Sequence, residues 1–272
     1  MDTADNTTTR EREAHAVDQL ITALPGEWRF DHEVAQDFDQ HVRRSVPLYD
    51  QAQQMIVEMS EWFVRDGMSV YDLGTSTGET IHQLQHKHAG KKDVRFVGID
   101  NSLPMLEKAR AKCGNGNVHF LHQNLTATSE FPDAGLVTAL YTLQFLPVSE
   151  RRKVLERVHR DLKEGGAILI VEKLRGESSI FEDIWLELYW DMKQRSGLNA
   201  DQVLAKARSL RGVLVPLSVS ENVAMLRDAG FACVDVFMKW YNFAGLIAIK
   251  MERSESEMVS RLTSMPRAEI IS

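Results

Sequence analysis

The chain has 272 residues, a formal net charge of −7 and a pI near 5.7. This length suffices for one full α/β core, but the acidic balance argues against the broad phosphate-binding surface that RNA or DNA requires. Cys113 and Cys233 lie far apart without C-x-x-C or zinc spacing, and no segment has the roughly 18 apolar residues of a membrane span. We therefore expect a cytoplasmic protein that binds neither nucleic acid nor membrane.

The first fifty residues are expected to form a tail and a helical lid. Residues 1–15 are polar, whereas residues 33–44 place Val34, Phe38 and Val42 at helical spacing before Pro47. Because this helix precedes a glycine-rich loop, we expect it to lie over the ligand and to bring Tyr49 to the site. Residues 51–65 then predict an amphipathic helix whose aromatic residues, including Trp62, pack in the core.

A glycine-rich loop follows, and it organises the rest of the chain. An apolar, β-branched stretch runs into Asp72-Leu73-Gly74-Thr75-Ser76-Thr77-Gly78 and then into a helical pattern, which predicts a strand, a tight turn and a helix start. Glycine lets a flat ligand lie against the backbone, and N–H groups at a helix start favour polar ligand groups. The spacing differs from the dinucleotide fingerprint and favours a nucleoside ligand. The expected contacts are Asp72, Gly74, Thr75, Ser76 and Gly78.

The histidines after this loop raise the possibility of a metal site. His82 and His86 share a helix face and His88 follows, but no carboxylate or thiolate joins them at ligand spacing. We expect a solvated helix end and no metal.

A second strand, residues 94–99, ends in Asp100, 26 residues after Gly74. In a doubly wound sheet, a carboxylate at this place can accept hydrogen bonds from both ribose hydroxyls. The following helix has Ser102 as its cap and Pro104 in its first turn. This places the first residues of the helix beside the ligand and makes Met105 an apolar contact for adenine.

The next two strands extend the same pocket. After the strand at residues 118–122, the turn at Asn124 and Leu125 is expected to hydrogen-bond the adenine amino group. The fourth strand, at residues 135–139, leads into Leu140 and Tyr141, with Thr142 and Gln144 in the loop beyond. Ligands bind at the carboxyl ends of strands in open sheets, so these residues are expected to line the pocket.

The last third of the chain is expected to cap the site and complete the sheet. A crossover helix at residues 149–162, starting at Ser149, precedes a buried strand at 167–173. The segment at about 178–212 reads as an aromatic helix and a basic helix, a helical cap with Tyr189, Trp190 and Arg208 facing the substrate. A helix at 219–229 and an antiparallel hairpin at 233–250 complete the domain of residues 51–251. Residues 252–272 form a polar tail.

Several of these motifs resemble those of one family. The Asp-Leu-Gly-x-x-x-Gly loop and Gly98-Ile99-Asp100 resemble the S-adenosylmethionine (SAM) site of class I methyltransferases. From residue 26 to 250 the chain resembles the carboxy-S-adenosyl-L-methionine (carboxy-SAM) synthase family more specifically. The matches are Trp28, Phe30-Asp31, Arg44-Ser45-Val46-Pro47, Tyr49, Tyr71-Asp72-Leu73-Gly74, Ile99-Asp100-Asn101-Ser102, Thr142-Leu143-Gln144-Phe145-Leu146, Glu172-Lys173 and Asn242-Phe243.

The resemblance implies an α/β, Rossmann-like class I methyltransferase fold, with a mostly parallel seven-stranded sheet and an antiparallel C-terminal hairpin. It implies SAM as cofactor and a homodimer. Carried over residue by residue, the cofactor positions become Tyr49, Gly74, Thr75, Ser76, Asp100, Asn101, Asn124 and Leu125.

The chain departs from the family at three positions. The family has an acidic residue where this chain has Asn124, an Asn where it has Leu140, and an Arg that holds the extra carboxylate where it has Ala207. Arg208 stands beside Ala207, but one residue turns a helical side chain by about 100°. A carboxylate without its Arg loses a charge-assisted contact, so these departures disfavour carboxy-SAM more than SAM.

The sequence therefore predicts a SAM-dependent methyltransferase for a small-molecule acceptor that carries a carboxylate. Carboxy-SAM synthesis from SAM and prephenate is the alternative, and a non-catalytic SAM-binding protein is a third. Methyl transfer from a sulfonium is an in-line displacement that mainly needs alignment and exclusion of water. The sequence identifies no general base; Tyr141, His122 and Tyr189 are candidates by position only.

Overall fold

The computed structural model describes residues 30–114 and 116–251, so the predicted tails lie largely outside the described residues. Its strands are β1 (Ser69–Leu73), β2 (Arg95–Asp100), β3 (Val118–His122), β4 (Ala134–Leu140), β5 (Leu162–Lys173), β6 (Cys233–Trp240) and β7 (Phe243–Ile249). Its helices are α3 (His32–Ser45), α4 (Tyr49–Met59), α5 (Glu79–Lys87), α6 (Leu103–Cys113), α7 (Val148–Asp161), α8 (Ser179–Arg195), α9 (Ala200–Ser209) and α10 (Val219–Asp228), with short 3-10 turns η1 (Ser60–Trp62) and η2 (Leu143–Phe145).

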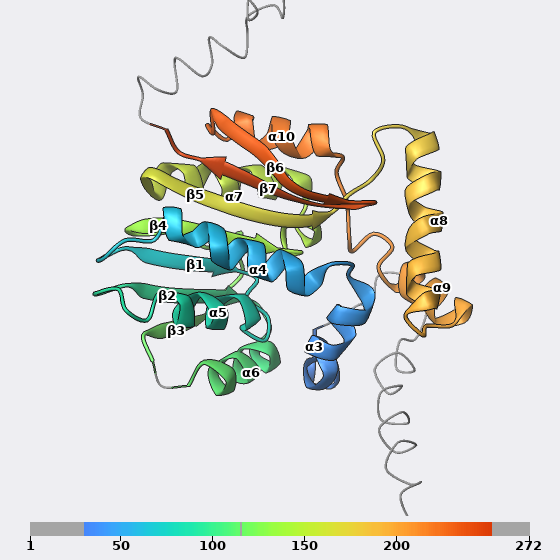
Figure 1. Cartoon of the computed structure of the whole chain (residues 1–272), viewed down its shortest axis with the longest axis horizontal. Helices are drawn as coiled ribbons and strands as arrows, with labels where there is room; N and C mark the ends of the chain where they lie inside the picture. The colour runs from blue at the N-terminus through green and yellow to red at the C-terminus, as the bar shows by residue number, and fades with distance from the viewer. Residues whose placement is uncertain (1–29, 115, 252–272) are drawn as a thin grey trace, which may run out of the picture.

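The strands form one seven-stranded sheet in the order β3-β2-β1-β4-β5-β7-β6 (Figure 1). The five strands from β3 to β5 are parallel, and β7 pairs antiparallel with both β5 and β6. The predicted α/β fold with an antiparallel C-terminal hairpin is confirmed. The central strands are buried on both faces, as is typical of parallel strands; all five residues of β1 are buried.

Helices cover both faces of the sheet. On one face, Ala52 and Ile56 of α4 and Ile81 and Leu84 of α5 are fully buried against β1, β2 and β5. On the other face, α7 and α10 contribute a second apolar cluster that includes Leu155 and Leu226. These two layers hold the sheet rigid, so the loops at its carboxyl edge can be positioned accurately.

Two helices lie outside this three-layer body. In Figure 1, α8 stands across the carboxyl ends of β4 and β5, with α9 beside its end. The chain enters α8 directly after β5 and returns through α9 to α10, so the predicted insertion at about residues 178–212 is a pair of helices.

Two local predictions were wrong. Trp62 is 79% exposed, because the helix ends at Met59 and the η1 turn rotates this side chain away from the core. Helix α7 begins at Val148 with Pro147 in the cap position, so Ser149 lies inside its first turn. A proline there loses no intrahelical bond, since the first N–H groups of a helix have no partner.

Between residues 30 and 251, Asn115 aside, every helix is too short or too polar to cross a membrane.

Candidate active site

A cavity of about 520 Å³ lies at the carboxyl ends of β1, β2, β4 and β5 and is covered by α3, α8 and α9. Most of the predicted contacts line it: Tyr49, Asp72, Gly74, Thr75, Ser76, Asp100, Asn101, Met105, Asn124, Leu125, Leu140, Tyr141, Tyr189 and Trp190. The predicted loop residues Thr142 and Gln144 also do so. The topology thus brings sixteen predicted contacts, spread over 142 positions, to one cavity.

The glycine loop turns sharply over the second strand. Gly74 has φ +68°, and the N–H groups of Gly74 and Thr75 both donate to the Ile99 carbonyl, at 2.8 and 3.0 Å. A Cβ at Gly74 would lie 2.3 Å from the Thr142 hydroxyl oxygen. Glycine is therefore needed here both for the left-handed backbone and for close approach to the β4 loop.

Asp100 ties this loop to the start of α6. One carboxylate oxygen accepts the Ser76 N–H at 2.9 Å and the other accepts the Ser102 N–H at 2.8 Å. Burial raises the pKa of Asp100, while these backbone N–H groups act in the opposite direction. Each carboxylate oxygen has a further lone pair, so the group can still accept ligand hydroxyls.

Asp72 is a second carboxylate at this end of the cavity. It is buried and accepts the Thr138 hydroxyl at 2.7 Å. Burial raises the pKa of Asp72 to about 6, and the hydrogen bond from Thr138 limits the rise. With Asp100 and Glu79 also lining the cavity, this end suits a ligand with hydroxyl groups and positive charge.

Asn124 is placed differently from the expectation. Its side-chain oxygen accepts both the backbone N–H and the hydroxyl of Thr126, each at 3.0 Å. The oxygen that was expected to meet the adenine amino group thus already has two donors. The side-chain N–H groups are the better candidates for a ligand contact.

Gly78 and Arg208 do not line the cavity. Gly78 starts α5, and a Cβ there would lie 2.9 Å from the Cβ of Ala109, so this glycine allows α5 and α6 to pack closely. Lys206 and Ala207 at the end of α9, and Leu210 and Arg211 just beyond it, line the cavity. These positions recur at helical spacing on one face, and Arg208 falls outside it.

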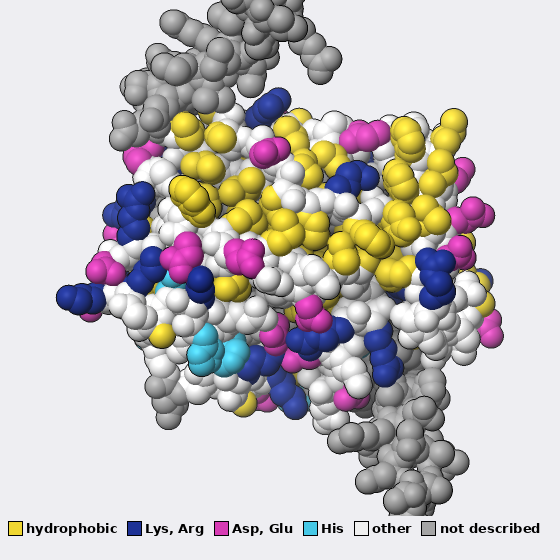
Figure 2. Space-filling model, viewed as in Figure 1, with side chains coloured by type: hydrophobic (Ala, Val, Ile, Leu, Met, Phe, Trp, Pro, Cys, Tyr) yellow, Lys and Arg dark blue, Asp and Glu magenta, His cyan; other side chains and the backbone are white. Residues whose placement is uncertain are grey.

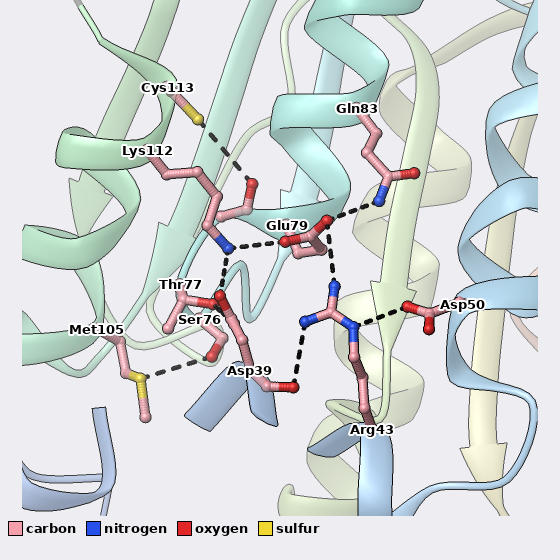
Figure 3. Close-up of polar contacts among 11 residues, drawn as sticks. Asp39, Arg43, Asp50, Ser76, Thr77, Glu79, Gln83, Met105, Lys112 and Cys113 are labelled. Atoms are coloured by element: carbon pink, nitrogen blue, oxygen red, sulfur yellow. Dashed lines mark hydrogen bonds and ion pairs between the residues drawn. The ribbon is translucent and has the colours of Figure 1, made fainter. Parts of the chain in front are cut away.

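Helix α3, which lines the cavity, is held to the cavity wall by a polar network (Figure 3). Asp39 accepts hydrogen bonds from Lys112 Nζ at 2.7 Å and from the Thr77 hydroxyl. Lys112 also contacts Glu79 at 2.8 Å, so one lysine bridges α3, α5 and α6. From the other side, the Tyr189 hydroxyl donates to the Ser45 carbonyl at 3.0 Å and joins α8 to the end of α3.

A basic end of the cavity was largely missed by the sequence reasoning. Its cations come from the end of β5, from α8, from α9 and from just beyond α9: Lys173, Lys193, Lys206 and Arg211. Lys173 Nζ lies 4.9 Å and Lys193 Nζ 4.5 Å from the centre of the Tyr189 ring. Burial lowers the pKa of Lys173, and Lys193 lowers it further. Charges gathered in this way favour an anionic ligand group.

An aromatic wall joins the two ends. Tyr49 stacks on Tyr141 with 6.0 Å between ring centres, Tyr141 meets the edge of Phe243 at 6.2 Å, and Phe243 meets Tyr189 at 5.3 Å. The cavity therefore runs from carboxylates, past aromatic rings, to ammonium and guanidinium groups.

The loop after β4 is anchored by a buried carboxylate. Glu172 accepts the backbone N–H groups of Thr142, Leu143 and Gln144 at 3.2, 2.9 and 2.9 Å. Burial raises the pKa of Glu172 to about 8 against these bonds and the charge of Arg151. This carboxylate fixes the loop that presents Tyr141 and Thr142 to the cavity.

The described residues contain no group of three His, Cys, Asp or Glu side chains that could hold a metal ion. The rings of His82 and His86 pack edge to face, 4.4 Å apart.

Comparison with known proteins agrees with the fold. A methyltransferase domain model matches residues 70–166. An O-methyltransferase family protein from Burkholderia thailandensis superposes with a TM-score of 0.58 at 20% identity, covering 91% of this chain and 70% of that one. The fold is that of a class I methyltransferase.

Two curated relatives narrow this class. Carboxy-S-adenosyl-L-methionine synthase from Staphylococcus epidermidis is 35% identical over 227 residues, covering 83% of this chain and 98% of that protein. The Methylococcus capsulatus enzyme of the same name is 39% identical over 225 residues, covering 81% and 93%. The chain belongs to the carboxy-S-adenosyl-L-methionine synthase family, which confirms the predicted resemblance and the predicted enzyme class.

Proposed function

We propose that this protein is a SAM-dependent methyltransferase that acts on a small acceptor bearing a carboxylate. The observation that supports this choice is that Leu140 and Ala207 both line the cavity. These are the two positions where the family was expected to carry Asn and Arg, and here neither offers a polar contact. A methyl group is apolar and needs no such partner, whereas a carboxylate buried without one is costly.

The carboxylate end of the cavity supports SAM binding there. Asp100 would accept the ribose hydroxyls, Met105 would contact adenine, and Asp72 would face the ammonium and sulfonium charges of the cofactor. Family membership and the prediction from the glycine loop both lead to SAM as the cofactor. Tyr49 and Leu125 complete the proposed contacts.

The basic end supports a carboxylate-bearing acceptor. Trp190 and Tyr189 give it apolar walls, and Arg211, four residues after Ala207 and just beyond the end of α9, also lines the cavity. We assign to Arg211 the substrate-binding role that was predicted for Arg208. As the acceptor atom bonds to the methyl carbon, the carbon–sulfur bond breaks and its electron pair stays on sulfur; a protonated acceptor also loses its proton. Helices α3, α8 and α9 would exclude water during this step.

Carboxy-SAM synthesis from SAM and prephenate is the second candidate. It is favoured by the relatives of that name and by the four cations, which suit a dicarboxylate such as prephenate.

The two candidates differ in their products. Incubation of the protein with SAM and prephenate, followed by mass spectrometry, is expected to show no carboxy-SAM and no phenylpyruvate. Native mass spectrometry should show SAM bound. In calorimetric titrations, the affinity for prephenate is expected to fall about tenfold or more in Arg211→Ala. It should be unchanged in Arg208→Ala, which removes a matched arginine outside the cavity.

Formation of carboxy-SAM would make the second candidate correct. Failure to bind SAM would contradict both candidates, and equal effects of the two arginine substitutions would remove the role given to Arg211.

We also propose a homodimer. Figure 2 shows a band of hydrophobic side chains across the face in view, running toward α8. On α8, Ile180, Phe181 and Ile184 are 68%, 47% and 42% exposed, and Trp240 on β6 is 39% exposed. Phe181 stacks on Trp185, which stacks on Tyr241, so these residues form one apolar face.

Light scattering at micromolar concentration should therefore give twice the 30.9 kDa mass of one chain. Phe181→Glu should yield monomers, because it buries a charge in the proposed interface. Leu121→Glu is the control, since this 42% exposed side chain lies on β3, at the opposite edge of the sheet from β6. A monomeric wild-type protein would contradict the proposal.

A further inference from the structure

Two cavity-lining residues, Thr75 and Tyr141, have a buried hydroxyl that makes no hydrogen bond within the described residues, and Tyr141 lies in the aromatic wall that leads to the basic end. The Tyr141 oxygen is buried and has no hydrogen-bond partner within residues 30–114 and 116–251. Two other buried tyrosines are satisfied: the Tyr71 hydroxyl donates to the Pro132 carbonyl at 3.0 Å, and the Tyr189 hydroxyl donates to the Ser45 carbonyl at 3.0 Å. Buried polar groups without partners are uncommon in native proteins, and such a group in a cavity points to a ligand.

The backbone holds Tyr141 in an unusual conformation. The residue follows the end of β4 with φ +56°, a value that non-glycine residues seldom adopt. Its N–H donates to the Val171 carbonyl at 2.6 Å, and the following N–H groups bind Glu172. Such backbone strain clusters at functional sites, where the surrounding structure maintains it.

Packing also restrains the ring. Tyr49 stacks on one side and Phe243 meets it edge-on, so the side chain cannot turn freely to find a partner elsewhere. The hydroxyl is thus positioned before any ligand arrives, which lowers the entropic cost of binding.

The same surroundings keep the hydroxyl protonated. Burial raises the pKa of Tyr141, and the nearby Tyr49 and Glu172 raise it further. At neutral pH the group is therefore a phenol, which can donate to an anionic oxygen but cannot act as a base.

We propose that the Tyr141 hydroxyl donates a hydrogen bond to a carboxylate oxygen of the second substrate and thereby determines which acceptors bind. This inference rests on the proposed function and adds a residue that selects the acceptor. The aromatic wall leads from Tyr141 through Phe243 to Tyr189, where Lys173 and Lys193 stand over the ring. A dicarboxylate could thus meet a neutral donor at one end and cations at the other.

Tyr141→Phe removes only the hydroxyl and tests this directly. With prephenate as the probe, calorimetry is expected to show binding about 10- to 100-fold weaker than for the wild type, as for a lost hydrogen bond to a charged group. SAM binding should change by less than about twofold. The melting temperature without ligand should stay the same or rise, because the substitution removes an unsatisfied buried group.

Tyr71→Phe is the matched control. It deletes a hydroxyl that makes a structural hydrogen bond outside the cavity, so its melting temperature should fall and its prephenate affinity should not change.

Equal prephenate affinity for Tyr141→Phe and wild type would overturn the inference while leaving the proposed function intact. A lower melting temperature for Tyr141→Phe without ligand would also overturn it, since the hydroxyl would then have a structural partner. If the wild type binds SAM but not prephenate, the assigned ligand class is wrong; if it fails to bind SAM, the proposed function fails on its own measurement.

Discussion

Gly74→Val is expected to abolish SAM binding. The new Cβ would lie 2.3 Å from the Thr142 hydroxyl oxygen and 2.4 Å from its methyl carbon, so the glycine loop and the β4 loop would have to separate. Valine is also strained at φ +68°. Together these effects cost about 2 to 5 kcal/mol, and they fall on the two loops that line the cavity. From the sequence, the valine side chain was expected to occupy the volume of the ligand. In the structure it would instead clash with Thr142.

Gly67→Val is a closely matched control. Gly67 has φ +75°, but a Cβ there has nothing within 4 Å, so it shares the backbone strain without the clash. Calorimetry with SAM should show no binding for Gly74→Val and wild-type affinity for Gly67→Val, with circular dichroism showing that both variants fold. Wild-type stoichiometry in Gly74→Val would mean that the loop does not form the cofactor site.

The order and type of the elements could be predicted because they depend on local patterns. Apolar runs gave the buried strands, Ser102 capped α6 as expected by accepting the Met105 N–H, and the residues at the strand ends converged on one cavity. The strand order follows from the doubly wound connection. The sequence alone therefore predicted that Gly74 and Asp100 lie close together at one edge of the sheet.

The basic end could not be predicted in the same way. Lys173, Lys193 and Lys206 come from three elements, and their meeting depends on how α8 and α9 cross the strand ends. The face of α9 depends on its rotation about its own axis, which a short polar helix does not reveal. The four-residue spacing from Ala207 to Arg211 indicated that these two residues share a face. The prediction chose Arg208 instead, because it is adjacent to Ala207. Long-range ion pairs such as Asp39 with Lys112 leave no local pattern either.

Asp100→Ala should weaken SAM binding by about 2 to 4 kcal/mol, or roughly 30- to 1,000-fold in the dissociation constant. Two proposed ribose hydrogen bonds to a charged acceptor would be lost together. Part of the loss is indirect, because the Ser76 and Ser102 N–H groups, at 2.9 and 2.8 Å, also lose their acceptor. Asp66→Ala controls for general effects of losing such an acceptor, since Asp66 accepts the Lys92 N–H at 3.0 Å in an exposed turn away from the cavity. Its SAM affinity should match that of the wild type.

A cofactor analogue separates the direct and indirect parts of this loss. An S-adenosylmethionine analogue without the 2′- and 3′-hydroxyls cannot make the ribose hydrogen bonds. When this analogue is titrated, any difference in affinity between wild type and Asp100→Ala should therefore come from the indirect effect alone. The penalty of the substitution should therefore shrink by at least half in free energy, because hydrogen bonds to a charged acceptor contribute about 1.5 to 3 kcal/mol each. As in a double-mutant cycle, the substitution deletes the carboxylate and the analogue deletes the hydroxyls. The comparison therefore isolates the hydrogen bonds between Asp100 and the ribose. An equal penalty with SAM and with the dideoxy analogue would show that Asp100 only orders the two loops, and the ribose assignment would then be wrong.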